Sequence, residues 1–293
     1  MKVRKAAFAG SWYPDRVAVC EKEIKQFLKK SDFQKISLKN IIGGIVPHAG
    51  WYFSGAIACN VIRCLHAKND PDIIVVLGMH LHSDSPVYMI SDDVWETPLG
   101  SVTIEKELAY KLEKQLSSHI EPLDNFIQDN TIELQLPFIK YFFPDAKILP
   151  IGVPPLKRSF EIGDALAEIS AGLDQTVKVI GSTDLTHYGS NYGFTPKGTG
   201  HSAVEWVKNK NDRRVINAML SMDPDLVISE AKEHQNACCA GAAATAILAA
   251  KGLGAIKAES IAYSSSYDIN PDSSFVGYTG IVFPIYLWRN GNT

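Results

Sequence analysis

Histidine and aspartate side chains follow directly after three short apolar runs of this sequence. Continuous apolar runs that stop at Pro or Gly are typical of strands buried on both faces of a parallel sheet. The carboxyl ends of such strands share one edge of the sheet, where ligands bind, so we expect the polar side chains to converge there. The runs and the residues that follow them are Ile41–Val46 with His48, Ile73–Leu77 with His80 and His82, and Val177–Ile180 with Asp184 and His187.

These residue types favour a metal site. A neutral imidazole is the commonest metal ligand in proteins, and rigid strand ends give it a fixed geometry. Two histidines with one anionic ligand and open coordination positions suit redox metals and oxygen chemistry. The candidates for the anionic ligand are Asp184 and Cys239.

Cys239 has a position that suits two kinds of chemistry. It precedes a run of small residues, 240–250, that predicts a tightly packed helix, and a helix N-terminus stabilises a thiolate. A thiolate binds metal ions and also attacks carbonyl carbons. The alternative to a metal site is therefore a thiol hydrolase or transferase, with Cys239 as nucleophile, His187 as base and Asp184 as the orienting carboxylate.

The other histidines have simpler interpretations. His80 is interpreted either as a neighbour of His82 with no role of its own or as a hydrogen-bonding partner that supports it. Four more are interpreted as ordinary surface or core residues: His66, His119, His201 and His234.

Strand-like and helix-like segments alternate along the chain. Further strands are expected at Ile148–Val153, Ser260–Tyr263 and Phe275–Phe283. Helical spacing of apolar residues is found at 17–28 (after a possible cap at Asp15), 108–116 and 162–173, and the helix at 239–250 should end before Gly252. The alternation predicts one α/β domain over residues 1–293, with a layered sheet of largely parallel core strands flanked by helices.

The composition excludes several classes of protein. The chain has a net charge of −3 and no dominant cluster of Lys and Arg, so no nucleic-acid partner is expected. The lone G-x-G at 198–200 is too weak to indicate a nucleotide or flavin site. No apolar run approaches about 18 residues and the N-terminus lacks an apolar signal core, so neither a membrane span nor a membrane partner is expected. Five cysteines, an odd number, indicate a reducing compartment, which favours the cytoplasm.

Six short motifs, in order along nearly the whole chain, resemble the Memo family, which is named for a mediator of cell motility. The motifs are Phe8–Pro14 (similar to A-G-x-[FW]-Y), Pro47–Gly50 with Ser54 and Gly55 (P-H-A-G-Y), Leu77–His82 (L-G-x-x-x-H), Ile132–Pro137 (I-E-x-x-L-P), Ser182–His187 (S-[ST]-D-x-x-H), and Asn236–Gly241, the segment of the family's cysteine.

The resemblance implies a fold similar to that of class III extradiol dioxygenases, in which two His and a Glu hold Fe(II), with Cys in place of the Glu. At the matching positions His48 and His82 would be the imidazole ligands and Cys239 the thiolate ligand. Asp184 and His187 would line the pocket, with His187 in the place of the acid/base. The implied cofactor is one Fe(II) or Cu ion, and the implied activity is a metal-dependent, dioxygenase-like redox reaction of an unknown small molecule.

Protein partners are also implied, since eukaryotic members are reported as phosphopeptide-binding adaptors. Non-catalytic ligand binding is therefore a further hypothesis, although no Arg cluster lies near the histidine motifs to bind phosphate.

Two positions depart from the family pattern. Asn130 stands where the family usually has a His before I-E-x-x-L-P, and it cannot take a proton as His does. The family's usual C-G is here Cys239-Ala240, and Cys238 adds a second thiol that is an alternative ligand or half of an oxidisable pair.

Overall fold

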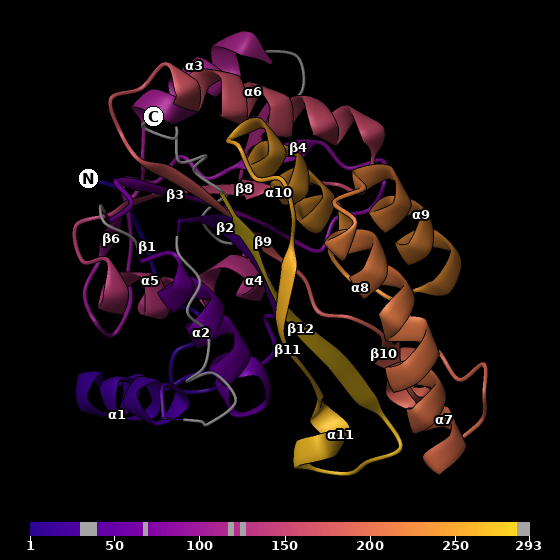
Figure 1. The fold of residues 1–293 in the computed structure, drawn as a ribbon. Coiled ribbons are helices and arrows are strands. Elements are labelled where there is room, and N and C mark those ends of the chain that lie inside the picture. Colours follow the sequence, from indigo (N-terminus) through magenta and orange to yellow (C-terminus); the bar gives the residue numbers. More distant parts are fainter. Residues whose placement is uncertain (30–39, 67–69, 117–119, 124–126, 286–293) are drawn as a thin grey trace, which may run out of the picture.

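A large mixed sheet forms the centre of the protein (Figure 1). The computed structural model describes residues 1–29, 40–66, 70–116, 120–123 and 127–285. The strands of the sheet, in spatial order, are β10 (His187–Tyr188), β12 (Phe275–Pro284), β2 (Ile41–Val46), β9 (Val177–Ser182), β3 (Ile73–Gly78), β8 (Lys147–Gly152), β4 (Val87–Met89) and β7 (Ile120–Pro122), with β11 (Glu259–Ser265) paired to β12. A small separate sheet is formed by β1 (Val3–Arg4), β5 (Val94–Trp95) and β6 (Val102–Thr103).

The four middle strands are parallel, as their apolar runs predict. β2 pairs with β9, β9 with β3, and β3 with β8, all in parallel. Every residue of β3 is buried, because side chains that alternate along the strand enter a core on either side: Ile74 and Val76 on one face, Val75 and Leu77 on the other. β12 and β11 are antiparallel additions beyond β2.

Helices cover both faces of the sheet, which confirms the layered α/β architecture (Figure 1). One face packs against α1 (Val17–Phe27), α2 (Ala56–Cys64) and α5 (Leu136–Phe142). The other packs against α3 (Glu107–Gln115), α6 (Phe160–Ala171) and α10 (Ala240–Gly252). Among the described residues, no helix combines the length and apolar character that crossing a membrane requires.

The small residues of α10 let this helix lie directly on the central strands. A side chain at Gly181 of β9 would come within 2.8 Å of the Ala242 carbonyl oxygen and of the Ala246 methyl group. Such close approach needs residues without bulk on both elements. The first turn of α10 is thereby fixed above the carboxyl end of β9.

Several details differ from the sequence expectations. α1 follows Arg16, which makes no side-chain cap, so Asp15 is not its N-cap, and Gly252 is the last residue of α10 rather than the residue after it. The sequence analysis did not identify α2 and α5. It also missed α4 (Asn130–Glu133), α7 (His201–Trp206), α8 (Asp212–Leu220), α9 (Pro224–His234), α11 (Ser266–Ile269) and two π-helical segments, Trp51–Gly55 and Val207–Asn211. His119 lies outside the described residues, and the prediction of a single domain stays a prediction.

Candidate metal centre

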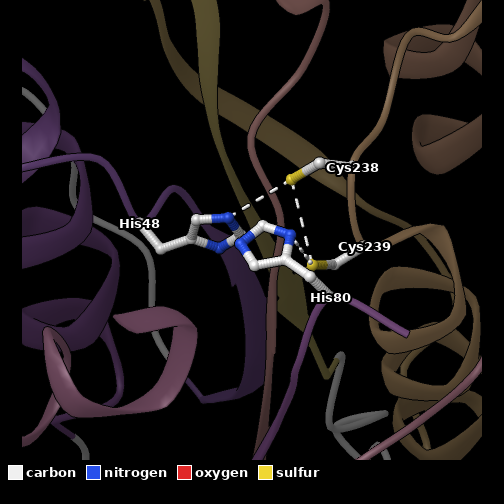
Figure 2. Close-up of side chains that lie close together, drawn as sticks. All are labelled: His48, His80, Cys238 and Cys239. Carbon is white, nitrogen blue, oxygen red and sulfur yellow. Dashed lines mark hydrogen bonds between the residues drawn. The ribbon is translucent and has the colours of Figure 1, made fainter. Parts of the chain in front are cut away.

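Four side chains from three distant segments meet at the carboxyl edge of the sheet. They are His48, His80, Cys238 and Cys239, and one ligand atom from each lies within 4.8 Å of all the others. Figure 2 shows the two imidazole rings facing the two sulfur atoms. The ring centroids of the histidines are 4.9 Å apart and the rings are perpendicular.

His48 follows β2 and is held by its neighbours in one orientation. Its backbone N–H donates to Asp184 Oδ1 at 2.7 Å. Ser182 Oγ donates to the Thr131 carbonyl oxygen and lies 3.0 Å from His48 Nδ1. Because the hydroxyl proton is used in that way, Ser182 Oγ accepts from Nδ1–H, which leaves Nε2 to face the sulfur atoms.

His80 reaches the cluster because the chain turns sharply after β3. Met79 has a φ of +71°, in the left-handed region that residues other than Gly rarely adopt. The Thr131 hydroxyl accepts from Met79 N–H at 2.7 Å and holds this conformation in place. The turn sends the His80 side chain toward Cys239, whose Sγ is 3.4 Å from His80 Nδ1.

His82 is exposed and is not a member of the four-residue group. The sequence analysis chose His82 as the ligand and His80 as its support, whereas the structure brings His80 to His48. A regular extended chain after β3 would not bring His80 to His48, because this placement depends on the left-handed conformation of Met79. A ligand role for His82 remains a prediction without support from this geometry.

The two cysteines stand at the start of α10, where Cys239 is the N-cap residue. Cys239 N–H donates to the Thr183 hydroxyl, and Cys238 Sγ accepts from Asp184 N–H at 3.2 Å. Cys238 Sγ also lies 3.2 Å from His48 Nε2 and 3.8 Å from Cys239 Sγ. Both thiols are therefore directed at the imidazoles, and Cys238, which the sequence offered only as an alternative ligand, contacts His48 directly.

Charge is shared between the imidazole of His48 and the sulfur of Cys238. Burial lowers the pKa of His48, but the charges of Asp184 and Cys238 outweigh this and raise it to about 9. Burial opposes ionisation of Cys238, yet the hydrogen bond between Cys238 and Cys239 and the charge of His48 bring its pKa well below the ordinary value. Burial and the neighbouring sulfur raise the pKa of Cys239. The thiolate form of Cys238 and the imidazolium form of His48 therefore stabilise each other.

Asp184 and His187 both line a cavity of about 540 Å³ that His48 and His80 also line. Burial raises the pKa of Asp184, while the charge of His48 opposes the shift. His187 Nδ1 donates to the Leu185 carbonyl oxygen at 3.2 Å, so in the neutral ring Nε2 carries the lone pair. The geometry leaves His187 available as a proton acceptor, and no hydrogen bond joins it to Cys239.

The segment Asp129–Gln135 supports the site from behind. Asn130 Nδ2 donates to the His48 carbonyl oxygen, so the residue that replaces the family's usual His has a positioning contact. The buried Glu133 accepts from the backbone N–H groups of Ala7 and Phe8 and from the Tyr13 hydroxyl. The N-terminal motif, Phe8–Pro14, and the I-E-x-x-L-P motif, Ile132–Pro137, therefore contact each other through Glu133.

The donor set fits a single metal ion. Two thiolates bound at about 2.3 Å in a tetrahedral arrangement lie about 3.8 Å apart, which is the separation of Cys238 Sγ and Cys239 Sγ. The nitrogen–sulfur separations of 3.2 and 3.4 Å are close to those of the same geometry. Two imidazoles and two thiolates are four donors, which would fill the four positions of a tetrahedral ion.

Comparisons with known proteins agree on one family. The family model described as Memo-like protein matches residues 4–282. A MEMO1 family protein of Pyrococcus furiosus is 32% identical, with 96% of this chain and 98% of that protein covered. One of Nitrosopumilus maritimus is 32% identical over 96% of this chain and 99% of its own length.

A solved structure of an uncharacterised Escherichia coli K12 protein is also similar. It has a TM-score of 0.49 and 11% identity, and the match covers 73% of this chain and 86% of that one.

Proposed function

The chain belongs to the Memo family, and from that premise we propose that it is a mononuclear metal protein with a redox function on a small molecule. The observation that carries the proposal is the convergence of His48, His80, Cys238 and Cys239 within 4.8 Å. His80 takes the ligand position that the sequence analysis gave to His82, and Cys238 joins Cys239.

The two sulfur donors favour a thiophilic ion. Soft thiolate ligands select copper(I), zinc or iron, whereas carboxylate sites select harder cations. We propose copper or Fe(II), with copper favoured by the second thiolate. The ion, when bound, would exchange electrons with a small molecule at the cavity, as in the dioxygenase-like activity that the family resemblance implies.

The protein's own side chains would orient the substrate and move protons. His187 would accept a proton at Nε2, because its Nδ1–H is held by the Leu185 carbonyl oxygen. Asp184 would hold the His48 loop through the backbone N–H of His48. General acid/base work of this kind contributes about 10²- to 10⁴-fold to a rate.

Metal binding by matched variants tests the proposal. Reduced, anaerobic protein is titrated with Cu(I) and separately with Fe(II), and bound metal is measured by elemental analysis and by X-ray absorption at the metal edge. We expect one ion per chain with nitrogen and sulfur ligands. His80→Ala should weaken binding by about 100-fold or more, while the control His82→Ala, two residues away, should bind as the wild type does.

Two outcomes would overturn parts of this proposal. Equal metal affinity of the two histidine variants would remove the four-residue site. Stoichiometric zinc that neither copper nor iron displaces would keep the site and end the redox function.

A thiol enzyme is the second candidate, and the contact between Cys238 and His48 favours it. Here Cys238 Sγ would be the nucleophile and His48 the base, with Asp184 Oδ2 at 4.0 Å from His48 Nε2. This arrangement replaces Cys239 and His187, which the sequence analysis put in those roles. Fast alkylation of Cys238 by iodoacetamide that persists in the presence of copper would favour the thiol enzyme over the metal protein.

A further inference from the structure

The cavity beside the cluster has a lining that selects ligands by charge. Its volume of about 540 Å³ is that of a site for a small organic molecule. Two carboxylates, those of Asp184 and Asp272, line it together with the imidazoles of His48, His80 and His187, and none of its lining residues is Lys or Arg. Asp184 Oδ2 lies 4.0 Å from His48 Nε2, whereas none of the ion pairs among the described residues involves Asp272.

Aromatic rings are concentrated at the same cavity. Among the described residues, four aromatic side chains are exposed, and three of them line it: Trp12 (41%), Tyr52 (71%) and Tyr192 (47%). They come from three segments that are distant in the sequence, so local composition does not explain the grouping. Exposed aromatic groups that gather around one cavity mark a binding surface.

Aromatic faces and carboxylates attract the same kind of ligand. The ring quadrupole is negative on its face and binds an ammonium group, and a nearby carboxylate adds direct attraction. An anionic ligand would meet the carboxylate of Asp272, and the cavity lining has no Lys or Arg to offset its charge. A phosphopeptide is therefore disfavoured.

Metal in the neighbouring site would not reverse this preference. Two thiolates neutralise a divalent ion and exceed the charge of a monovalent one, so the loaded cluster adds no net positive charge. A metal-bound imidazole is neutral, so the carboxylates of Asp184 and Asp272 would then set the sign of the charge in the cavity.

We propose that this cavity binds a small organic cation, an ammonium group on an aromatic or other flat apolar frame. The inference extends the proposed function, since it names the substrate class of the same site. The ammonium group would lie by Asp272, and the frame would pack on Trp12, Tyr52 and Tyr192.

Three probes that share a phenylethyl frame and differ in the charge of the polar group test the proposal: phenethylammonium, 2-phenylethanol and 3-phenylpropanoate. Their binding to the full chain is measured by calorimetry and by saturation-transfer NMR, with metal-free and with copper-loaded protein. We expect phenethylammonium to bind at about 1 mM or tighter, and about tenfold more tightly than the other two.

Two variants assign the preference to the cavity. Asp272→Asn should reduce the preference for the cation several-fold, and added salt should have a smaller effect on binding than in the wild type. The control Asp145→Asn removes an exposed aspartate that does not line the cavity and should change nothing.

Three results would overturn the proposal: no saturable binding of phenethylammonium, equal or tighter binding of 3-phenylpropanoate, or an Asp272→Asn variant that binds as the wild type does. Metal stoichiometry is measured on the same samples. Normal metal binding with failed cation selectivity rejects only this inference, whereas selectivity without metal binding rejects only the metal function.

Discussion

The two edges of the central sheet handle buried charge in opposite ways. At the carboxyl edge, His48, Asp184 and Cys238 are buried or half-buried and each faces another ionisable group. At the other edge, Lys178 of β9 is buried, and its ammonium group donates to the carbonyl oxygens of Ile41 and Leu65. None of the described carboxylates forms an ion pair with it.

The contrast separates a reactive edge from a structural one. Two ionisable side chains in contact can pass a proton between them, or one of them can bind an ion in place of the other. Each change is possible because a neighbouring charge balances the one that is lost or gained. The ammonium group of Lys178 has only neutral acceptors, and burial lowers its pKa to about 8. The predictions that follow perturb first one edge and then the other.

Gly241→Ala should have the largest effect, because it should displace the start of α10 and with it the cysteines at the carboxyl edge. A methyl group there would lie 2.4 Å from the Pro154 carbonyl oxygen and 2.5 Å from that of Val153, so the first turn of α10 must move. We expect a loss of about 3 kcal/mol or more in the free energy of unfolding and a marked loss of metal affinity. Denaturant unfolding and metal titration measure both.

Gly172→Ala is the matched control for this change. Its methyl group would meet only the Ile169 carbonyl oxygen, at 3.5 Å, an ordinary contact. A similar loss in both variants would mean that the close packing of α10 is not what holds the cysteines.

Lys178→Met tests the opposite edge through pH. The pKa of Lys178 is about 8 in the folded protein and ordinarily 10.5, so the unfolded chain binds more protons between these values. The contribution of Lys178 to stability therefore increases as pH rises from about 8 to 10.5, by about 3 kcal/mol at most. Urea unfolding of wild type and variant across this range should show the slope in the wild type alone; parallel curves would contradict it.

Thr131→Val tests the turn that selects His80. The variant keeps the shape of the side chain but leaves Met79 N–H without its acceptor. We expect a loss of about 2 kcal/mol in stability and weaker metal binding, since His80 is no longer held. Thr103→Val, at an exposed position of β6, is the control. Unchanged metal binding in Thr131→Val would show that the left-handed turn does not depend on the hydroxyl.

Ser182→Ala should have the smallest effect, and it tests what orients the His48 ring at the carboxyl edge. It removes the acceptor of His48 Nδ1–H, so the ring is free to change tautomer. We expect metal affinity to fall about tenfold with little change in stability. Metal titration of this variant beside Ser101→Ala, an exposed control, measures it. An unchanged affinity would show that Asp184 and the backbone suffice to orient the ring.

The sequence predicts the parts of the fold and site that depend on periodicity. Continuous apolar runs identify β2, β3 and β9, and the residue after each strand end locates the site edge. Periodicity does not show that Met79 is left-handed, because that depends on Thr131 more than fifty residues away. Periodicity therefore could not show that His80, and not His82, reaches His48. Adjacent cysteines before a small-residue helix were the available signal for Cys238, and only packing shows both directed at the histidines.

The hydrogen bonds that Glu133 accepts from Ala7, Phe8 and Tyr13 have a consequence for the first fourteen residues of the chain. Trp12 is a wall of the cavity, and its carbonyl oxygen accepts from Trp51 N–H beside the histidine loop. Since Glu133 holds this stretch through Ala7, Phe8 and Tyr13, proteolytic trimming at the start of the chain would open the cavity to solvent on one side. If both proposals hold, a shortened protein should still bind the metal ion but should no longer discriminate between ligands of different charge.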